Sequence, residues 1–250
     1  MCGRFSLTLS PEVFRAAFGY PEQPNFPPRY NIAPTQPVAI VTEREGERHF
    51  GLVRWGFLPG WVKDPKDFPL VINARGETLD SKATFKAALR RRRCVFLADG
   101  FYEWQRRGRE KAPFLIRMRD EGPMPLAGLW ETYTDRSGSE IDTAAIVTTD
   151  ANGVLAAVHD RMPVILSREG VGAWLDVAAA DHKDALGLVR PCPEDWLTMV
   201  PVSSRVNKVA NDDPDLQTPL AAPEARPEPP AARKADTPRS SDEDEQGRLF

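Results

Sequence analysis

A cysteine at the second position is the most reactive feature of the sequence. Because Cys2 is small, we expect the ordinary aminopeptidase to remove Met1, which would leave an α-amine and a thiol on adjacent carbons. The α-amine has an ordinary pKa of about 7.7–8.0 and the thiol one of about 8.5, so both are partly available near neutral pH. An aldehyde, such as the open form of an abasic deoxyribose, would give a Schiff base and then a thiazolidine ring. Taken alone, a small residue at a mobile chain end explains Cys2 as well.

Three further residues could serve such a reaction, and each also has a structural interpretation. His159 lies at a predicted helix-to-strand junction and could transfer a proton, although a lone histidine is more often structural. Glu103 lies between aromatic residues that would desolvate it and favour acid–base work, or it is an exposed glutamate on an edge strand. Asn73 follows a buried-looking strand and could orient a substrate oxygen, or it forms a turn.

Cations and a flat ring accompany these candidates. An arginine lies two residues beyond Cys2, Asn73 and His159, and a tryptophan directly follows Glu103. The four accompanying residues are Arg4, Arg75, Arg161 and Trp104. Single-stranded nucleic acid is held by cations along its phosphates and by aromatic rings on which bases stack. The same short segments therefore predict both chemistry and strand binding.

The overall composition is neutral on nucleic acid. Among 250 residues, 33 Lys and Arg nearly balance 36 Asp and Glu, so a DNA-binding surface would have to be local. The three cysteines show neither C-x-x-C nor histidine spacing, which argues against a disulfide framework and a zinc site. We find no secretory signal and no run of eighteen apolar residues, and we expect a protein of the reducing cytoplasm, with no contact to a membrane.

Short apolar runs alternate with turn residues up to about residue 216. Ser10 is expected to cap a helix that begins at Pro11 and stops at Gly19. Further helices are predicted over 84–92 after a cap at Asp80 or Ser81, from a cap at Asp150 to Val158, and over 171–175. Strands are predicted at 38–41, 50–57, 94–97, 114–119, 126–130, 143–148 and 163–166. This pattern predicts an α+β domain with antiparallel sheets around one core.

The composition of the chain changes at residue 217. Residues 217–250 are rich in proline, alanine and charge and carry almost no large apolar side chain, so they cannot bury enough surface to fold. We therefore predict one domain over residues 1–216 and a disordered tail over 217–250. The tail ends in Gln246-Gly247-Arg248-Leu249-Phe250, which has the form of a docking peptide or of a frayed terminus.

Taken together, these segments resemble the SRAP (SOS-response-associated peptidase) family. The resemblance rests on residues 1–5 (MCGRF), 29–34 (RYNIAP), 55–61 (WGFLPGW), 72–78 (INARGET), 98–104 (ADGFYEW) and 159–163 (HDRMP), and on Pro201-Val202-Ser203 with Val206-Asn207. In order and spacing these blocks cover roughly residues 2–216. The chain departs from the pattern at 61–63 and at the insertion-like residues 64–68, which would alter how DNA is held at that edge.

The resemblance implies a single SRAP-type domain that binds single-stranded DNA and forms a thiazolidine cross-link at abasic sites, without a metal or organic cofactor. It implies that Cys2 is the covalent residue and that Asn73, Glu103 and His159 complete the active site. DNA contacts around the lesion are implied for Arg4, Asn31, Arg75, Trp104 and Arg161. The family name also records a peptidase activity, which could be limited to the removal of Met1.

The ending of the chain is similar to the Gln-x-x-Leu-Phe peptides that dock on the bacterial sliding clamp. Gln246, Leu249 and Phe250 are therefore predicted to bind the clamp and to place a bacterial, monomeric protein at replication forks on the nucleoid. Two other functions stay open. One is a thiol peptidase with Cys2 as nucleophile and His159 as base. The other is a non-catalytic strand-binding module, whose binding would be reversible and sensitive to salt.

Overall fold

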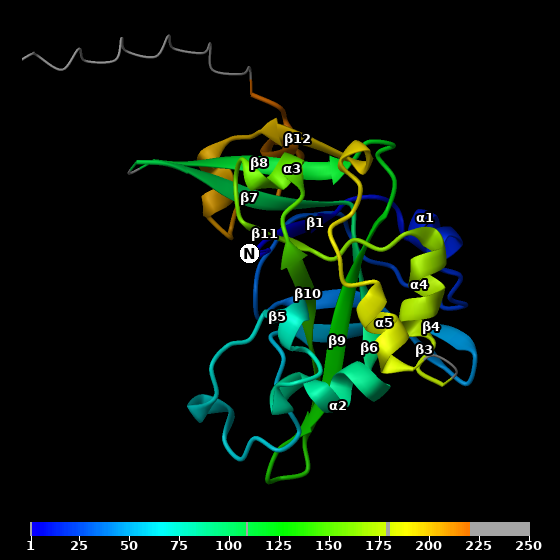
Figure 1. Ribbon diagram of the computed structural model, residues 1–250. Helices are drawn as coiled ribbons and strands as arrows, with labels where there is room; N and C mark the ends of the chain where they lie inside the picture. Colours follow the sequence, from blue (N-terminus) through cyan, green and yellow to red (C-terminus); the bar gives the residue numbers. More distant parts are fainter. Residues whose placement is uncertain (1, 109, 179–180, 221–250) are drawn as a thin grey trace, which may run out of the picture. The chain divides into compact units, whose positions relative to one another are not determined.

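The computed structural model describes residues 2–108, 110–178 and 181–220. The chain divides into one unit over residues 1–220 and a second over residues 221–250, and every helix and strand described here lies in the first (Figure 1). The predicted tail lies outside the described residues except for 217–220, and so do Gln246, Leu249 and Phe250. Gln217, which the sequence placed in that tail, has a buried side chain.

An antiparallel sheet of five strands holds the N-terminal strand between two others. In spatial order its strands are β12 (Leu197–Pro201), β8 (Glu110–Met118), β7 (Gly100–Arg107), β1 (Phe5–Leu7) and β2 (Arg29–Ile32). Strands β7 and β8 form a hairpin with Gly100 opposite Arg117 at one end and Arg107 opposite Glu110 at the other. Residues close to the N-terminus therefore lie against β7, which carries Gly100–Trp104, the larger part of the block 98–104 from the sequence resemblance.

A second sheet of seven strands closes on itself. It consists of β11 (Arg161–Pro163), β10 (Glu140–Asp150), β4 (Glu47–Trp55), β3 (Pro37–Arg44), β6 (Arg93–Ala98) and β9 (Met124–Thr134), with β5 (Asn73–Arg75) on β10. Because β10 pairs with both β4 and β9, five of these strands form a small barrel. The pairings are antiparallel except those of β10 with β4 and with β5. The α+β class with antiparallel sheets is confirmed.

Within the described residues, five short helices lie beside the sheets (Figure 1). They are α1 (Pro11–Phe18), α2 (Ala83–Arg91), α3 (Gly153–Ala156), α4 (Arg168–Leu175) and α5 (His182–Gly187), with 3₁₀ turns at Pro65–Asp67, Gly76–Thr78, Glu194–Trp196, Ser204–Asn207 and Pro214–Gln217. The first helix follows its prediction, because Ser10 is the N-cap and Gly19 ends the helix with a φ of 71°. Among the described helices, none combines the length and the apolar character needed to cross a membrane.

Two predicted helix caps and one strand are wrong. Helix α2 follows Lys82 rather than Asp80 or Ser81, because the carboxylate of Asp80 faces Arg90 and His182 instead of the helix terminus. Helix α3 is capped by Asn152, whose side chain accepts the N–H of Leu155, and it stops at Ala156 rather than Val158. Asp150, the predicted cap, is the last residue of β10. The strand expected at 163–166 spans Arg161–Pro163.

The N-terminal strand is fixed to both sheets. The ring of Phe5 lies 5.1 Å from the ring of Trp55 and 6.3 Å from that of Phe96, measured between centroids. On the other side, the buried carboxylate of Asp99 accepts hydrogen bonds from the side chains of Ser6 and Thr8, at 2.6 and 2.9 Å, and from the backbone N–H groups of Thr8 and Leu9. Carboxylate hydrogen bonds of this kind are among the stronger ones in proteins. The position of the residues that precede Phe5 is thereby set.

Candidate active site

Cys2 lies against β5 and β7. The side-chain Nδ2 of Asn73, the first residue of β5, donates to the carbonyl oxygen of Cys2 at 2.9 Å. The backbone N–H of Tyr102, on β7, donates to the carbonyl oxygen of Arg4, also at 2.9 Å, and Cys2 Sγ lies 4.0 Å from that same oxygen. The structure therefore brings Cys2 and Asn73, two of the four predicted catalytic residues, into direct contact.

The thiol of Cys2 is protected from ionisation. Burial of Cys2 raises the pKa of its thiol well above the ordinary value, because a thiolate there would lose its hydration. The negative charge of Glu103 raises the pKa of this thiol further. Glu103 is itself buried, with 3% of its surface exposed, so little water screens its charge from the thiol. Both effects favour the thiol over the thiolate in the chain that begins at Met1.

Two more of the predicted catalytic residues meet at a cleft of about 490 Å³. The cleft is lined by Arg4, Glu103, Trp104, Arg106, Lys111, His159 and Asn207. Glu103 comes from β7, and His159 from the segment that joins α3 to β11. A larger hollow of about 910 Å³ between α1, β8 and α4 contains none of the predicted residues. The smaller cleft is the candidate site, because four of the predicted residues, Arg4, Glu103, Trp104 and His159, line it; Cys2 and Asn73 are not among its lining residues.

The ring of His159 has two neighbours that compete for one nitrogen. Nδ1 lies 2.9 Å from the backbone N of Arg161 and 2.8 Å from Oδ1 of Asp160. A single nitrogen cannot accept the amide proton and also donate a proton to the carboxylate. We assign Nδ1 as the acceptor, because the amide proton is fixed by the backbone whereas the Asp160 side chain is 87% exposed to water. A neutral His159 then carries its proton on Nε2.

Hydrogen bonds hold Arg4 at one side of the cleft. Its Nη1 donates to Oδ1 of Asn31 at 2.7 Å and to the carbonyl oxygen of Val206 at 2.8 Å, and its guanidinium carbon lies 5.9 Å from the ring centroid of Trp104. Its buried Nε has no hydrogen-bond partner among the described residues. Burial lowers the pKa of Arg4, but an arginine stays charged at any physiological pH. A fixed cation thus stands beside the aromatic ring.

The side chain of Asn31 forms its hydrogen bonds with other protein groups instead of facing solvent. It is 1% exposed, and its Nδ2 donates to the carbonyl oxygens of Val206, Lys208 and Asn211 at 3.2, 3.1 and 2.8 Å. These bonds tie β2 to the loop that follows β12 and fix the oxygen that receives Arg4. In this geometry Asn31 supports Arg4, so its predicted role in DNA binding would be exerted through that arginine.

The two remaining predicted arginines differ in their surroundings. Arg75 is exposed on β5. Arg161 is only 13% exposed in its side chain, and its guanidinium contacts both oxygens of Glu77 at 2.5 and 3.0 Å and Oδ1 of Asp150 at 2.7 Å. The hydrogen bonds with Glu77 raise the pKa of Arg161 and lower that of Glu77. The charge of Arg161 is therefore matched by two carboxylates, whereas Arg75 is open to solvent.

Three residues of the cleft were not predicted. Asn207 accepts a hydrogen bond of 2.7 Å from Nε1 of Trp104 and so orients the ring. Arg106 lies two residues beyond Trp104 on the same strand, so the alternation of side chains on β7 could have placed it on the same face. Lys111 enters the cleft only through the register of the β7–β8 hairpin. Among the described residues, no three His, Cys, Asp or Glu side chains are grouped so as to hold a metal ion.

Comparison with known families agrees with the motifs that form this site. A model of the SOS response associated peptidase (SRAP) family matches residues 1–209, which is most of the chain. The chain belongs to the SRAP family. The matched residues include the SRAP segments that supply Cys2, Asn73, Glu103 and His159. The resemblance stated from the sequence is confirmed.

Among curated SRAP relatives, the abasic site processing protein YoqW of Bacillus subtilis (strain 168) is 35% identical over 220 residues, which cover 86% of this chain and 98% of the relative. The abasic site processing protein YedK of Escherichia coli (strain K12) is 33% identical, with 88% and 100% covered. A structure from Bordetella bronchiseptica matches with a TM-score of 0.70 at 26% identity, over 81% of this chain and all of the other. One from Bacteroides thetaiotaomicron has a TM-score of 0.80 at 24% identity, over 88% and 100%, which establishes the common fold.

Proposed function

We propose that this SRAP protein binds single-stranded DNA at abasic sites and cross-links to the opened sugar through Cys2, which would shield the lesion during replication. The observation that carries the proposal is the position of Cys2: Asn73 holds its carbonyl, and its thiol is close enough to Glu103, which lines the 490 Å³ cleft with His159, for that carboxylate to act on it. Curated relatives that align with nearly this whole domain bear the name abasic site processing protein. The proposal requires a chain from which Met1 has been removed.

The chemistry of ring closure sets the order of the two bonds. The α-amine attacks first, because the thiol closes the ring by adding to the carbon of an imine that must already have formed. An α-amine with an ordinary pKa of about 7.7–8.0 is roughly one tenth neutral at pH 7, which suffices for addition to an aldehyde. The amine nitrogen bonds to C1′ of the open sugar, and one water molecule leaves as the imine forms. His159 can supply the proton that the departing oxygen needs from its imidazolium form, which leaves a neutral ring.

The thiol then closes the ring. A new bond joins Sγ of Cys2 to the former aldehyde carbon, the C=N double bond becomes single, and the thiol proton ends on the ring nitrogen. Glu103 is suited to carry that proton, since its carboxylate acts on the thiol electrostatically and lines the same cleft. No oxidant or cofactor enters this balance. The product is a five-membered thiazolidine that holds the DNA covalently.

The residues around the cleft provide for the strand. Arg4 and Trp104 present a cation and a flat ring side by side, which suits phosphate contact and base stacking. Arg75 offers an exposed cation on β5, next to Asn73. Arg161 would reach a phosphate only by sharing a guanidinium already held by Glu77 and Asp150. We expect Arg4, Trp104 and Arg75 to contribute more to DNA affinity than Arg161.

A thiol peptidase that attacks with Cys2 is not what we propose. Peptide hydrolysis by cysteine uses the thiolate, which forms readily only where the surroundings lower the pKa of the thiol. Here burial and a neighbouring carboxylate raise it. Peptide turnover in trans, lost in Cys2→Ala and unaffected by DNA, would support the peptidase instead.

We further propose that Gln246, Leu249 and Phe250 bind the bacterial sliding clamp, which would bring a monomeric protein to replication forks on the nucleoid. This rests on the similarity of the ending to clamp-binding peptides. A chain that ends at residue 245 should form the cross-link normally and should lose binding to the purified clamp. Equal clamp binding by the shortened chain contradicts this part of the proposal.

The cross-linking proposal is tested with a single-stranded oligonucleotide that carries one abasic site. The parent should give an adduct that survives heating in denaturing gel buffer, and Cys2→Ala should give none. Cys2→Ser keeps the amine and should yield an adduct only after borohydride reduction of the imine, because oxygen replaces the sulfur that closes the ring. An unreduced, heat-stable adduct of equal yield with Cys2→Ala would exclude the mechanism.

A further inference from the structure

The β7–β8 hairpin carries two positive charges directly opposite each other. Arg106 of β7 pairs in register with Lys111 of β8, and both side chains are exposed and line the 490 Å³ cleft. Like charges at directly opposed positions of an antiparallel pair destabilise it. Within the described part of the chain, neither side chain forms an ion pair. The repulsion destabilises the hairpin, and an anion bound between the two side chains would offset it.

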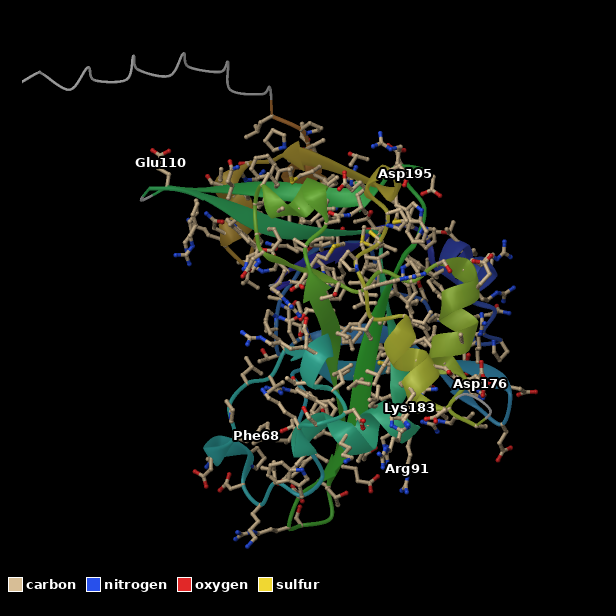
Figure 2. All side chains as sticks on the ribbon, in the orientation of Figure 1. Phe68, Arg91, Glu110, Asp176, Lys183 and Asp195 are labelled. Carbon is tan, nitrogen blue, oxygen red and sulfur yellow. The ribbon has the colours of Figure 1, made fainter. Side chains whose placement is uncertain are left out.

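The two cations continue a row that begins at Arg4. Trp104 and Arg106 are two residues apart on β7, so their side chains stand on the same face about 7 Å apart. Arg4 lies over the ring of Trp104, and Asn207 holds the indole nitrogen of that ring. The row therefore consists of the cation of Arg4, the ring of Trp104 and the two cations of the hairpin. Asn207 fixes the orientation of the ring. Figure 2 shows Glu110, next to Lys111, at the projecting end of the hairpin, so the row leads from the cleft toward solvent.

We propose that Arg106 and Lys111 bind the phosphates of the DNA strand on one side of the lesion, with the base between them and Arg4 stacked on Trp104. A phosphate between the two side chains would offset their repulsion, since neither forms an ion pair within the described part of the chain. The inference rests on the proposed function for the identity of the strand. It adds the path by which the strand leaves the cleft.

The test separates strand binding from cross-linking. Binding of a fluorescent single strand without an abasic site is measured between 50 and 200 mM salt for the parent and for Arg106→Gln/Lys111→Gln. Loss of two phosphate contacts lowers the slope of log K against log salt by about 1.4, which corresponds to a salt-induced loss of affinity about 7-fold smaller than in the parent. The matched control is Lys82→Gln/Lys86→Gln, which removes the same charge at α2, at the other end of the domain from the hairpin (Figure 1).

A charge reversal distinguishes a ligand site from a structural pair. Arg106→Glu would face Lys111 with the opposite sign, so the hairpin should be as stable as in the parent or more so, measured by thermal unfolding, while strand affinity falls. A salt slope of the double variant equal to that of the control, or an unchanged affinity in Arg106→Glu, overturns the inference. Because the probe has no abasic site, these outcomes do not depend on the thiazolidine. Failure of the cross-link itself would show separately, in the parent, with an abasic strand.

Discussion

The contact between Asn73 and Cys2 gives the sharpest prediction for the chemistry. The amide Nδ2 of Asn73 donates to the Cys2 carbonyl oxygen at 2.9 Å, a partly buried bond that fixes the residue bearing both nucleophiles. Asn73→Ala removes this bond, which is worth about 1 kcal/mol, so the rate of cross-linking at saturating DNA should fall about 5-fold. Asn73→Asp keeps the size of the side chain but replaces the donor with an oxygen.

In Asn73→Asp the carboxylate would face the Cys2 carbonyl at hydrogen-bond distance with no proton between them. An unpaired acceptor and a second negative charge near the thiol add at least about 1 kcal/mol, for a total near 2 kcal/mol and a loss of about 30-fold. The isosteric change should therefore be worse than truncation. The rate of adduct formation is followed on denaturing gels with an abasic oligonucleotide in excess.

The order of the two variants decides the interpretation. If Asn73 only fills space, the isosteric aspartate should be the milder change and the alanine the more severe one. Urea unfolding of both proteins serves as the control, since a general loss of stability would slow both variants through the fold. An Asn73→Asp protein that cross-links as fast as the parent would refute the positioning role.

Three further outcomes follow from the structure. Asp99→Asn should lower the free energy of unfolding in urea by about 3 kcal/mol, because the amide cannot accept all the donors now bound by the carboxylate, and a loss below about 1 kcal/mol would contradict this. The pKa of Glu77 is lowered in the fold, so its pair with Arg161 stabilises above about pH 4.3 and is lost as the pH falls through the lowered value. Glu77→Gln should therefore cost no more than about 1 kcal/mol at pH 7, since Glu77 is half exposed, and the cost should shrink as the pH falls below about 4.3. A deficit that grows with acid would show the sign to be wrong. At pH 8, Cys2 should be alkylated at least about 10-fold more slowly in the folded protein than in urea, as measured by peptide mass mapping. Equal rates would contradict the raised pKa and the burial of Cys2.

Local patterns in the sequence accounted for much of the fold. The helix at Pro11–Phe18 carries its own start and stop signals, and the strands of the barrel are apolar runs between turn residues. The misplaced caps at Asp80 and Asp150 share one cause. Each carboxylate is used by a partner distant in sequence, His182 in one case and Arg161 in the other, and no local rule contains such partners.

Site residues could be predicted where the chemistry depends on residue type. They could not be predicted where their position depends on partners that are distant in the sequence. Glu103 and His159 were chosen for their chemistry, and they line one cleft. No local pattern indicates that Asn31 is buried and bonded to Arg4, or that Arg161 pairs with Glu77, 84 residues away. Lys111 required the register of a hairpin, which a sequence specifies only weakly where neither face of the strand is fully buried.

The most direct test of the account is the intact mass of the adduct formed by protein expressed without any tag. We predict the mass of the chain without Met1 plus that of the oligonucleotide, minus one water, and a peptide map that places the modified sugar on Cys2. An adduct that retains Met1, or one attached to any other residue, would contradict it.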